Sequence, residues 1–290
     1  MASQKPSKLN QLSRVLPEGL VVDAAWLEER GYSHPLRQKY VANGWLEMLV
    51  RGVYRRPAAG LGQKAGRAPL DWRWVVLSMN SLLDYDVHVG GRTAAEQVGI
   101  SHYLPMDRTK TIHLYADRLP GWLQRLPVDV SWSIHRTSTL FDTEALKAPL
   151  PPTKLGKAPV DLVLLSGLTR ISVDAGSWTI LVSMPERAIL EILDELPEHE
   201  SFENADKLME GLTNVRPRTM QHLLEACRSI KVKRLFLFLA ERHRHAWLKK
   251  LDTSRIQLGS GKRALVPSGR YSKKYQITVP EFLMQNDDAG

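Results

Sequence analysis

The spacing of apolar residues near the N-terminus predicts two short helices followed by two short strands. Asp23 can cap a first helix that ends at Gly31, and Ser33 can cap a second helix. The next segment, WLEMLVRGVYRRP, alternates apolar and polar residues as a hairpin does, with Arg51-Gly52 in its turn. Two helices joined by two or three residues and followed by a hairpin are typical of a winged helix-turn-helix.

Beyond this hairpin the pattern predicts a linker and then further helices. PAAGLGQKAGRAP has no apolar period and is typical of a flexible connection. LDWRWVVLSMNSLL and RTAAEQVGI have helical spacing, and these helices either support the N-terminal domain or open the next one. We predict an N-terminal domain over 1–95, with a winged-helix core at about 8–57, a linker at 58–69 and supporting helices at 70–95, and a C-terminal domain over 96–290.

The C-terminal part contains both the alternating pattern of strands and the three-to-four spacing of helices, so we expect an α/β mixed (α+β) protein. Two strand-like runs, TIHLYA and VDVSWSIHRT, precede a proline-rich loop at 147–159. LTRISV and WTILVS then flank Asp174-Ala175-Gly176-Ser177, which is a hairpin signal. From Ser183 to Leu251 apolar residues recur at three and four positions, which predicts a series of helices, and YQITV follows as a strand.

The net charge of +9 is distributed unevenly along the chain. Residues 1–70 carry a net charge of +6, residues 71–230 carry −5, residues 231–275 carry +11 and the remaining residues carry −3. Two basic regions therefore flank an acidic middle. Charge this concentrated favours a polyanionic partner, and we favour nucleic acid over a merely solvated basic surface.

The second predicted helix carries side chains that can recognise bases. Its apolar residues share one face, which leaves the polar residues of its first half towards solvent. In helix-turn-helix proteins this half enters the major groove, where Arg pairs with guanine and Gln with adenine, while arginines of the hairpin can hold phosphates. The candidate DNA-binding residues are Ser33, His34, Arg37, Gln38, Lys39, Arg51, Arg55 and Arg56. A winged helix that only docks protein is the alternative.

The basic region after residue 230 contains a second candidate surface. An apolar stripe in KVKRLFLFLAERHRHAWLKKL places its cations mostly on the remaining faces of a helix, and GSGKRALVPSGRYSKKY adds more. The candidate residues are Lys233, Arg234, Arg242, Lys262, Arg263, Arg270, Lys273 and Lys274. Two explanations account for such charges equally well. One is a solvated helix face, and the other is a contact surface for DNA flanks, RNA or an acidic protein face.

Patterns that resemble catalytic or metal sites have simpler explanations. Ser183-Met184-Pro185-Glu186 has the spacing of a capping box, which we favour over a polar site that includes Glu186 and Arg187. His243 and His245 point to different sides of a helix, lack further ligands at zinc-site spacing and are expected at the surface. We therefore expect no catalytic residue, no metal and no cofactor.

The cysteine count and the hydropathy pattern limit the cellular setting. The single cysteine, Cys227, excludes an intramolecular disulfide framework and lies in an apolar helical context, so we expect it in the core. No run of eighteen apolar residues occurs, and MASQKPSKLNQLSRVL lacks the apolar core of a secretory signal. We expect a cytoplasmic protein without membrane contact.

Several segments resemble one known family. The stretch from KLNQLSRVL to VRGVYRRP, followed by DWRWVVLSMN and VHVGGRTAAEQVG, is similar to the N-terminal winged-helix region of AbiEi-type antitoxins. SMPERAILEIL, VKRLFLFLAER and SGKRALVPSGRYSKKYQITVP resemble the C-terminal half of that family. The resemblance extends from about Lys8 to Pro280, with little match between about 125 and 170.

The resemblance implies a transcriptional regulator of a bacterial type IV toxin–antitoxin system. The N-terminal domain would bind double-stranded DNA at inverted repeats in its own promoter, as a monomer in solution or a dimer on DNA. The C-terminal domain would counteract a nucleotidyltransferase-like toxin without needing a stable complex. An alternative makes the C-terminal domain an enzyme that modifies the toxin or its substrate.

Overall fold

Helices and short strands alternate along the chain, which the computed structural model describes over residues 7–57, 70–100, 110–147, 165–174 and 178–284. The chain divides into two compact units, and each unit is built from three separate segments of the sequence. The first contains residues 1–87, 118–132 and 172–180, and the second contains 88–117, 133–171 and 181–290. The predicted linker at 58–69, most of the proline-rich loop at 147–159 and the tip of the hairpin at 175–177 lie outside the described residues.

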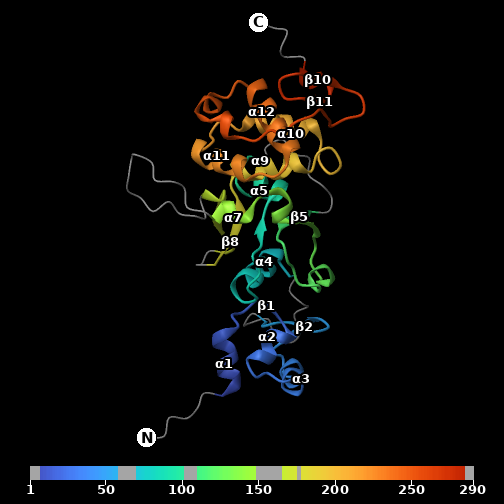
Figure 1. Cartoon of the computed structure of the whole chain (residues 1–290). Coiled ribbons are helices and arrows are strands. Elements are labelled where there is room, and N and C mark those ends of the chain that lie inside the picture. Colours follow the sequence, from blue (N-terminus) through green and yellow to red (C-terminus); the bar gives the residue numbers. More distant parts are fainter. Residues whose placement is uncertain (1–6, 58–69, 101–109, 148–164, 175–177, 285–290) are drawn as a thin grey trace, which may run out of the picture. The chain divides into compact units, whose positions relative to one another are not determined.

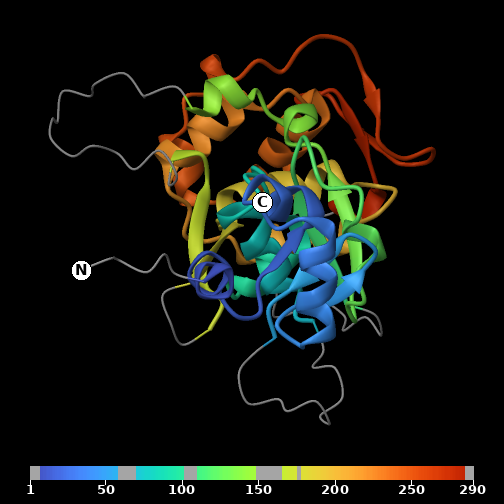
Figure 2. The same cartoon turned by 90° about the horizontal axis from the view of Figure 1, so that it is seen from below.

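The first unit begins with the winged-helix arrangement that the sequence predicts. Its elements are α1 (Lys8–Val15), β1 (Val21–Asp23), α2 (Ala24–Glu29), α3 (His34–Ala42), β2 (Glu47–Val50) and β3 (Val53–Arg55), drawn in blue in Figures 1 and 2. The three strands form an antiparallel sheet in the order β1-β3-β2, in which Tyr54 lies opposite Val22 and Met48. The predicted fold class, with an N-terminal winged helix-turn-helix, is confirmed.

Local chemistry sets the ends of these helices. The Asp23 side chain accepts a hydrogen bond from the backbone N–H of Trp26 at 2.9 Å and so caps α2. Gly31 has φ +79° and terminates that helix in the left-handed region, as predicted. Ser33 precedes α3 as its N-cap residue, although its hydroxyl makes no capping bond within the described segment 7–57.

A further helix, α4 (Trp72–Ser81), packs on β1 of the same unit. The buried Ser78 hydroxyl accepts a hydrogen bond from the backbone N–H of Val21 at 2.8 Å and donates to the carbonyl of Trp74. From the segment 118–132, which includes a short 3₁₀ helix at Leu123–Arg125, the Trp122 indole N–H donates to Asp23. The helix α4 therefore packs within the first unit.

The second unit contains most of a five-stranded sheet. Its strand order is β6 (Ser131–His135), β5 (Thr111–Tyr115), β4 (His88–Val89), β8 (Thr179–Ser183) and β7 (Leu168–Ser172). The central strand β4 is antiparallel to β5 and parallel to β8. Helix α5 (Gly91–Gln97) follows β4 and packs on α9 (Pro185–Asp194) in this unit, so α5 opens the second unit instead of supporting the first. The predicted domain boundary after residue 95 stays a prediction.

A helical layer holds the apolar core of the second unit. It contains α9, α10 (Phe202–Gly211), α11 (Pro217–Ala226) and α12 (Ile230–Arg242), with α6 (Thr137–Leu140), α7 (Thr143–Lys147) and 3₁₀ helices at Ala246–Lys250, Thr253–Arg255 and Glu281–Met284. A small sheet in the order β10 (Arg270–Ser272), β11 (Ile277–Val279) and β9 (Arg263–Ala264) completes the unit, and β10 and β11 are the red strands in Figure 2. Side chains such as Leu190, Phe236 and Ile277 are almost fully buried there.

Within the series of helices predicted from Ser183 to Leu251, the helical pattern is interrupted near Cys227. Helix α11 ends at Ala226, because Cys227 has extended dihedral angles and forms an isolated bridge with Phe141. Cys227 is buried, as predicted, and burial raises the pKa of its thiol to about 11. In the described part of the chain no helix is both long and apolar enough to cross a bilayer.

Candidate functional site

The exposed face of α3 contains most of the residues predicted to recognise bases. Ser33, His34, Gln38 and Lys39 are exposed, and Arg51 is exposed at the turn between β2 and β3. Gly52 takes φ +82° in this turn, a conformation that favours glycine. The structure therefore leaves one polar helix face and one arginine at the hairpin tip available to a partner.

Arg37 does not lie on the solvent face that we predicted for it. The residue is only 4% exposed, and its guanidinium donates to the carbonyl of Tyr32 at 2.7 Å and lies 3.6 Å from Glu28. The guanidinium also lies 3.5 Å from the carbonyl of Ala24, so its partners belong to α2 and to the residues between α2 and α3. Arg37 thus joins the two helices of the motif.

The two arginines at the exit of the hairpin also contact the protein itself. Arg55 is 8% exposed and pairs with Glu47 at 2.6 Å, directly across the sheet from it. Arg56 is half-buried; it donates to the carbonyl of Ser13 at 2.9 Å and pairs with Glu18 at 3.0 Å. The expectation that Arg55 lies at the surface is therefore wrong, because antiparallel register places its charge opposite a carboxylate.

The second predicted basic surface is smaller than the sequence suggests. Lys233 and Arg234 are buried, and the Arg234 guanidinium donates to four carbonyls of the C-terminal segment, including that of Gly261 at 2.7 Å. Arg242 is half-buried and pairs with Asp206 at 3.2 Å. The exposed members of the set are Lys262, Arg263, Arg270, Lys273 and Lys274, of which Arg270 pairs with Glu281 and Lys274 pairs with Glu241.

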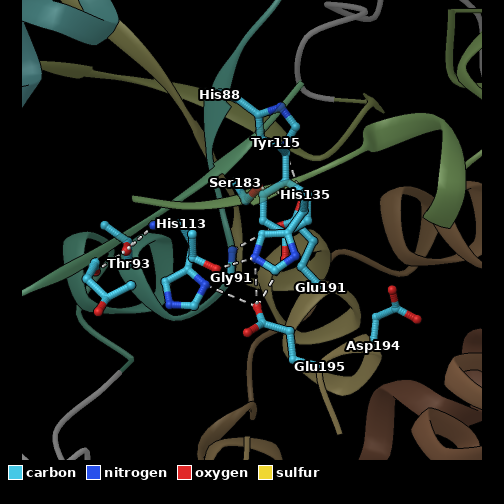
Figure 3. Close-up of polar contacts among 12 residues, drawn as sticks. His88, Gly91, Thr93, His113, Tyr115, His135, Ser183, Glu191, Asp194 and Glu195 are labelled. Carbon is cyan, nitrogen blue, oxygen red and sulfur yellow. Dashed lines mark hydrogen bonds and ion pairs between the residues drawn. The ribbon is translucent and has the colours of Figure 1, made fainter. Parts of the chain in front are cut away.

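A buried carboxylate, Glu191, lies at the centre of the polar side chains in the second unit (Figure 3). It is fully buried and is surrounded by four donors. Arg187 Nε lies 2.9 Å from Oε1, the Ser183 hydroxyl 3.0 Å, and His88 Nε2 3.0 Å, while the backbone N–H of Gly91 donates to Oε2 at 2.8 Å. A buried carboxylate is tolerated when its charge is compensated in this way.

The surroundings of Glu191 decide its protonation. Burial raises the pKa of a carboxyl, but the hydrogen bond and charge of His88, the charge of Arg187 and the N–H of Gly91 outweigh it. The pKa of Glu191 is lowered from 4.5 to about 2. The group is therefore ionised at neutral pH and acts as a charged link between strands and helices.

A second carboxylate, Glu195, lies one helical turn further along and faces two histidines. His113 Nδ1 is 3.2 Å from Oε1 of Glu195, His135 Nε2 is 3.7 Å from the same oxygen, and the Tyr115 hydroxyl donates to it at 3.3 Å (Figure 3). The rings of His113 and His135 are stacked within 7° of parallel, and Tyr115 stacks on His135. Burial lowers the pKa of His135, although the charge of Glu195 opposes this shift.

The capping-box interpretation of Ser183 and Glu186 is wrong. Ser183 ends β8 and its hydroxyl donates to Glu191 instead of capping α9, whose N-cap residue is Met184. Glu186 is buried and accepts a hydrogen bond from the backbone N–H of Arg216 at 2.7 Å. For Arg187 the other interpretation, membership of a polar site, is the better one, because its guanidinium binds Glu191.

His245 is buried and His243 is half-buried against α10, so the prediction that both lie at the surface is wrong for His245. His243 lies 2.7 Å from Asp206, and the buried His245 lies 2.7 Å from the carbonyl of Met209. The helix ends at Arg242 and Arg244 takes a left-handed conformation with φ +51°, so both histidines turn back onto α10. The prediction that these histidines lie at the surface assumed that the helix continues beyond Arg242.

The histidine–carboxylate cluster around Glu191 and Glu195 was not predicted from the sequence. Its histidines occur singly on separate strands, at positions 88, 113 and 135. Glu191 lies on α9 and Glu195 directly follows that helix, about a hundred residues after the first histidine. No short motif joins them. The one sequence feature that could have indicated this cluster is the presence of polar residues within strands and helices whose other residues are predicted to be buried.

Comparisons with known proteins agree with this two-part fold. Residues 5–106 match a family described as "Transcriptional regulator, AbiEi antitoxin N-terminal domain", and residues 109–280 match one described as "Transcriptional regulator, AbiEi antitoxin, Type IV TA system". The crystal structure of the RV2827C protein from Mycobacterium tuberculosis is similar, with a TM-score of 0.54 and 17% sequence identity over 96% of this chain and 92% of that one. At this identity the likeness shows the fold alone. No curated protein matches the chain.

The winged helix and both family matches define a transcriptional regulator. The chain belongs to the AbiEi antitoxin family of type IV toxin–antitoxin systems, since the two matches together extend over nearly all of it. The predicted family is confirmed.

Replacement of Gly90 by alanine is expected to destabilise the second unit. A Cβ atom at Gly90 would collide with Oε2 of Glu191 and with the ring of Tyr115, both of which are held in place. We expect Gly90→Ala to lower the free energy of unfolding by about 1–3 kcal/mol, measured by urea denaturation. Gly211→Ala is the control, because a Cβ there meets nothing within 4 Å. Equal stability of the two variants would contradict the packing around Glu191.

The stability of the protein is expected to depend on pH through Glu191. Because the pKa of this group is lowered on folding, its stabilising effect is complete above pH 4.5 and is lost as the pH falls towards 2. This loss amounts to about 3 kcal/mol. In Glu191→Gln the charge is absent, so the stability difference from the wild type should be largest at neutral pH and shrink towards pH 2, in denaturant titrations at each pH. A difference that does not vary with pH would refute this role.

Proposed function

We propose that this chain is a sequence-specific DNA-binding autorepressor that also acts as the antitoxin of a type IV system. In this proposal its first unit binds inverted repeats in its own promoter, and its second unit counteracts a nucleotidyltransferase-like toxin. The observation that supports DNA binding most directly is that one winged helix contains both an exposed polar face on α3 and an exposed arginine at the hairpin turn. Membership of a transcriptional regulator family agrees with it.

The exposed residues suit two kinds of contact. Gln38 can form a bidentate pair with adenine in the major groove, and Ser33 and His34 lie at the N-terminal end of α3, which usually approaches base edges. Lys39 and Arg51 are exposed cations, and in this proposal they contact phosphates, which hold a protein in register without recognising sequence. Arg37, Arg55 and Arg56 act in this proposal through the fold that presents these residues.

Inverted repeats imply two protomers on one operator. Half-sites one helical turn apart would allow two recognition helices to enter successive major grooves on the same side of the duplex. We propose that the protein is a monomer in solution and forms such a dimer on DNA.

The antitoxin activity is proposed to reside in the second unit and to proceed without catalysis or a stable complex with the toxin. The exposed lysines and arginines of the C-terminal segment, Lys262, Arg263, Arg270, Lys273 and Lys274, offer an anionic partner a contact surface. That surface is a candidate for the toxin-opposing function, since type IV antitoxins oppose the effect of the toxin.

Two substitutions in the first unit are expected to have different effects on DNA binding. Gln38→Ala should weaken binding to the protein's own promoter by about 1–3 kcal/mol and relax the base preference. Arg51→Ala should weaken binding to all sequences alike and reduce the slope of log K against log salt by about 0.9. Arg14→Ala, an exposed arginine on α1, is the control. Mobility-shift titrations at several salt concentrations measure these effects, and equal wild-type affinity for the promoter and for scrambled DNA would refute the repressor proposal.

The same variants are expected to separate the two activities. Gln38→Ala and Arg51→Ala should reduce repression of a promoter reporter but still protect cells that express the toxin of the same operon, because the proposed antitoxin function needs only the second unit. The gene for this protein and the gene for the toxin are expressed from unrelated promoters, and the growth of the cells is measured. Loss of protection in these variants would contradict separate functions, and a mass shift of the toxin after incubation with this protein and nucleotide would instead indicate an enzyme.

A further inference from the structure

Two histidines and one glutamate of the second unit direct their side chains towards a common point (Figure 3). His113 lies on β5, His135 at the end of β6, and Glu195 directly after α9. We infer that these three residues form a binding site for one divalent transition-metal ion of the zinc type. This site lies outside the proposed DNA-binding surface, and it contradicts our sequence-based expectation that the chain binds no metal.

The distances between the three side chains suit such an ion. Zinc binds imidazole nitrogen at about 2.0–2.1 Å and carboxylate oxygen at about 2.0–2.2 Å, so neighbouring ligand atoms of a tetrahedral site lie roughly 3.4 Å apart. The oxygen Oε1 of Glu195 lies 3.2 Å from His113 Nδ1 and 3.7 Å from His135 Nε2. All three ligand atoms are within 4.8 Å of one another. Small side-chain rotations would close this triangle around an ion.

The charges around Glu195 also favour a bound cation. Its side chain is only 6% exposed, and within the described residues the ion pairs of this carboxylate are with His113 and His135 and not with a lysine or arginine. The nearby guanidinium of Arg187 already binds Glu191. A buried carboxylate is costly unless positive charge compensates it. A divalent ion held by neutral imidazoles would provide that charge.

Neighbouring groups hold the proposed ligands in orientation, as the surroundings of metal sites do. The Tyr115 hydroxyl donates to Glu195, and its ring stacks on His135 at 4.7 Å. The Thr93 hydroxyl accepts a hydrogen bond from the backbone N–H of His113 at 2.9 Å. These contacts fix both the carboxylate and the strand that carries the first histidine.

Two contacts of the ligand nitrogens must change when the ion binds. The hydrogen bond of 3.2 Å between His113 Nδ1 and Oε1 of Glu195 gives way to bonds from both atoms to the metal. The Ser133 hydroxyl lies 2.9 Å from His135 Nε2, on the nitrogen that we assign to the metal. A χ1 rotation of this serine frees the nitrogen and leaves the hydroxyl able to bind a water molecule in the remaining coordination position. The His135 side chain is 23% exposed, which gives an ion a path from solvent.

A site with two imidazoles and one carboxylate discriminates between metal ions. Nitrogen ligands suit zinc, cobalt and nickel, whereas magnesium and calcium require oxygen ligands. A purely hydrogen-bonded cluster would show no such preference. Ion selectivity therefore distinguishes a metal site from a network of hydrogen bonds.

The inference is tested on the full-length protein after treatment with a chelator. Calorimetric titration with Zn²⁺ should show one ion per chain, Co²⁺ should produce visible absorption bands, and Mg²⁺ should not compete. His113→Ala, His135→Ala and Glu195→Gln should each weaken Zn²⁺ binding by at least about tenfold. His199→Ala, which removes an exposed histidine of the same unit, should leave binding unchanged.

Two results would overturn the inference. The first is Zn²⁺ affinity in the three ligand variants equal to that of His199→Ala. The second concerns the wild type alone and so does not require the variants to fold: X-ray absorption of the zinc-loaded protein that shows fewer than two imidazole ligands. Neither result depends on whether the protein binds DNA.

Discussion

The fully buried carboxylate of Glu191 is the interaction on which the second unit depends. Its four donors come from β4, the start of α5, the end of β8 and the first turn of α9. One ionised group thus ties the centre of the sheet to the two helices that pack beside it. Because an unpaired charge in this position would be far more costly than a lost apolar contact, the network specifies a single arrangement of these four elements.

Arginines have a structural role in both units of this basic protein. Arg37 joins the two helices of the helix-turn-helix, Arg55 pairs across the sheet, and Arg234 binds the carbonyls of the C-terminal segment. Guanidinium groups suit this role because they remain charged and can donate several hydrogen bonds in fixed directions. Fewer basic side chains are therefore exposed than the total charge implies, and in the first unit they include Lys39 on α3 and Arg51 at the hairpin turn.

Much of the fold could be predicted from the sequence, but much less of the site. The cap at Asp23, the left-handed Gly31 and the alternating pattern of the hairpin are local features, so the winged helix followed from them. The exposure of Arg37 was predicted wrongly, because the helical pattern assigns polar residues to the solvent face and does not show that Arg37 binds the carbonyl of Tyr32 and lies beside Glu28. Ser183 was assigned to a cap because the local pattern cannot reveal a partner eight residues away on a different element.

The sequence by itself determined the class of fold, the order of its elements and the family, because these depend on periodicity, turn chemistry and a succession of motifs. Only the tertiary structure brought His113, His135 and Glu195 together, since they lie on two strands and at the end of a helix that is separate in sequence. It also decided which arginines are buried and which polar residues of α3 remain exposed. The reason is physical: hydrogen bonds and ion pairs between distant residues depend on how strands and helices pack, and no local pattern records that packing.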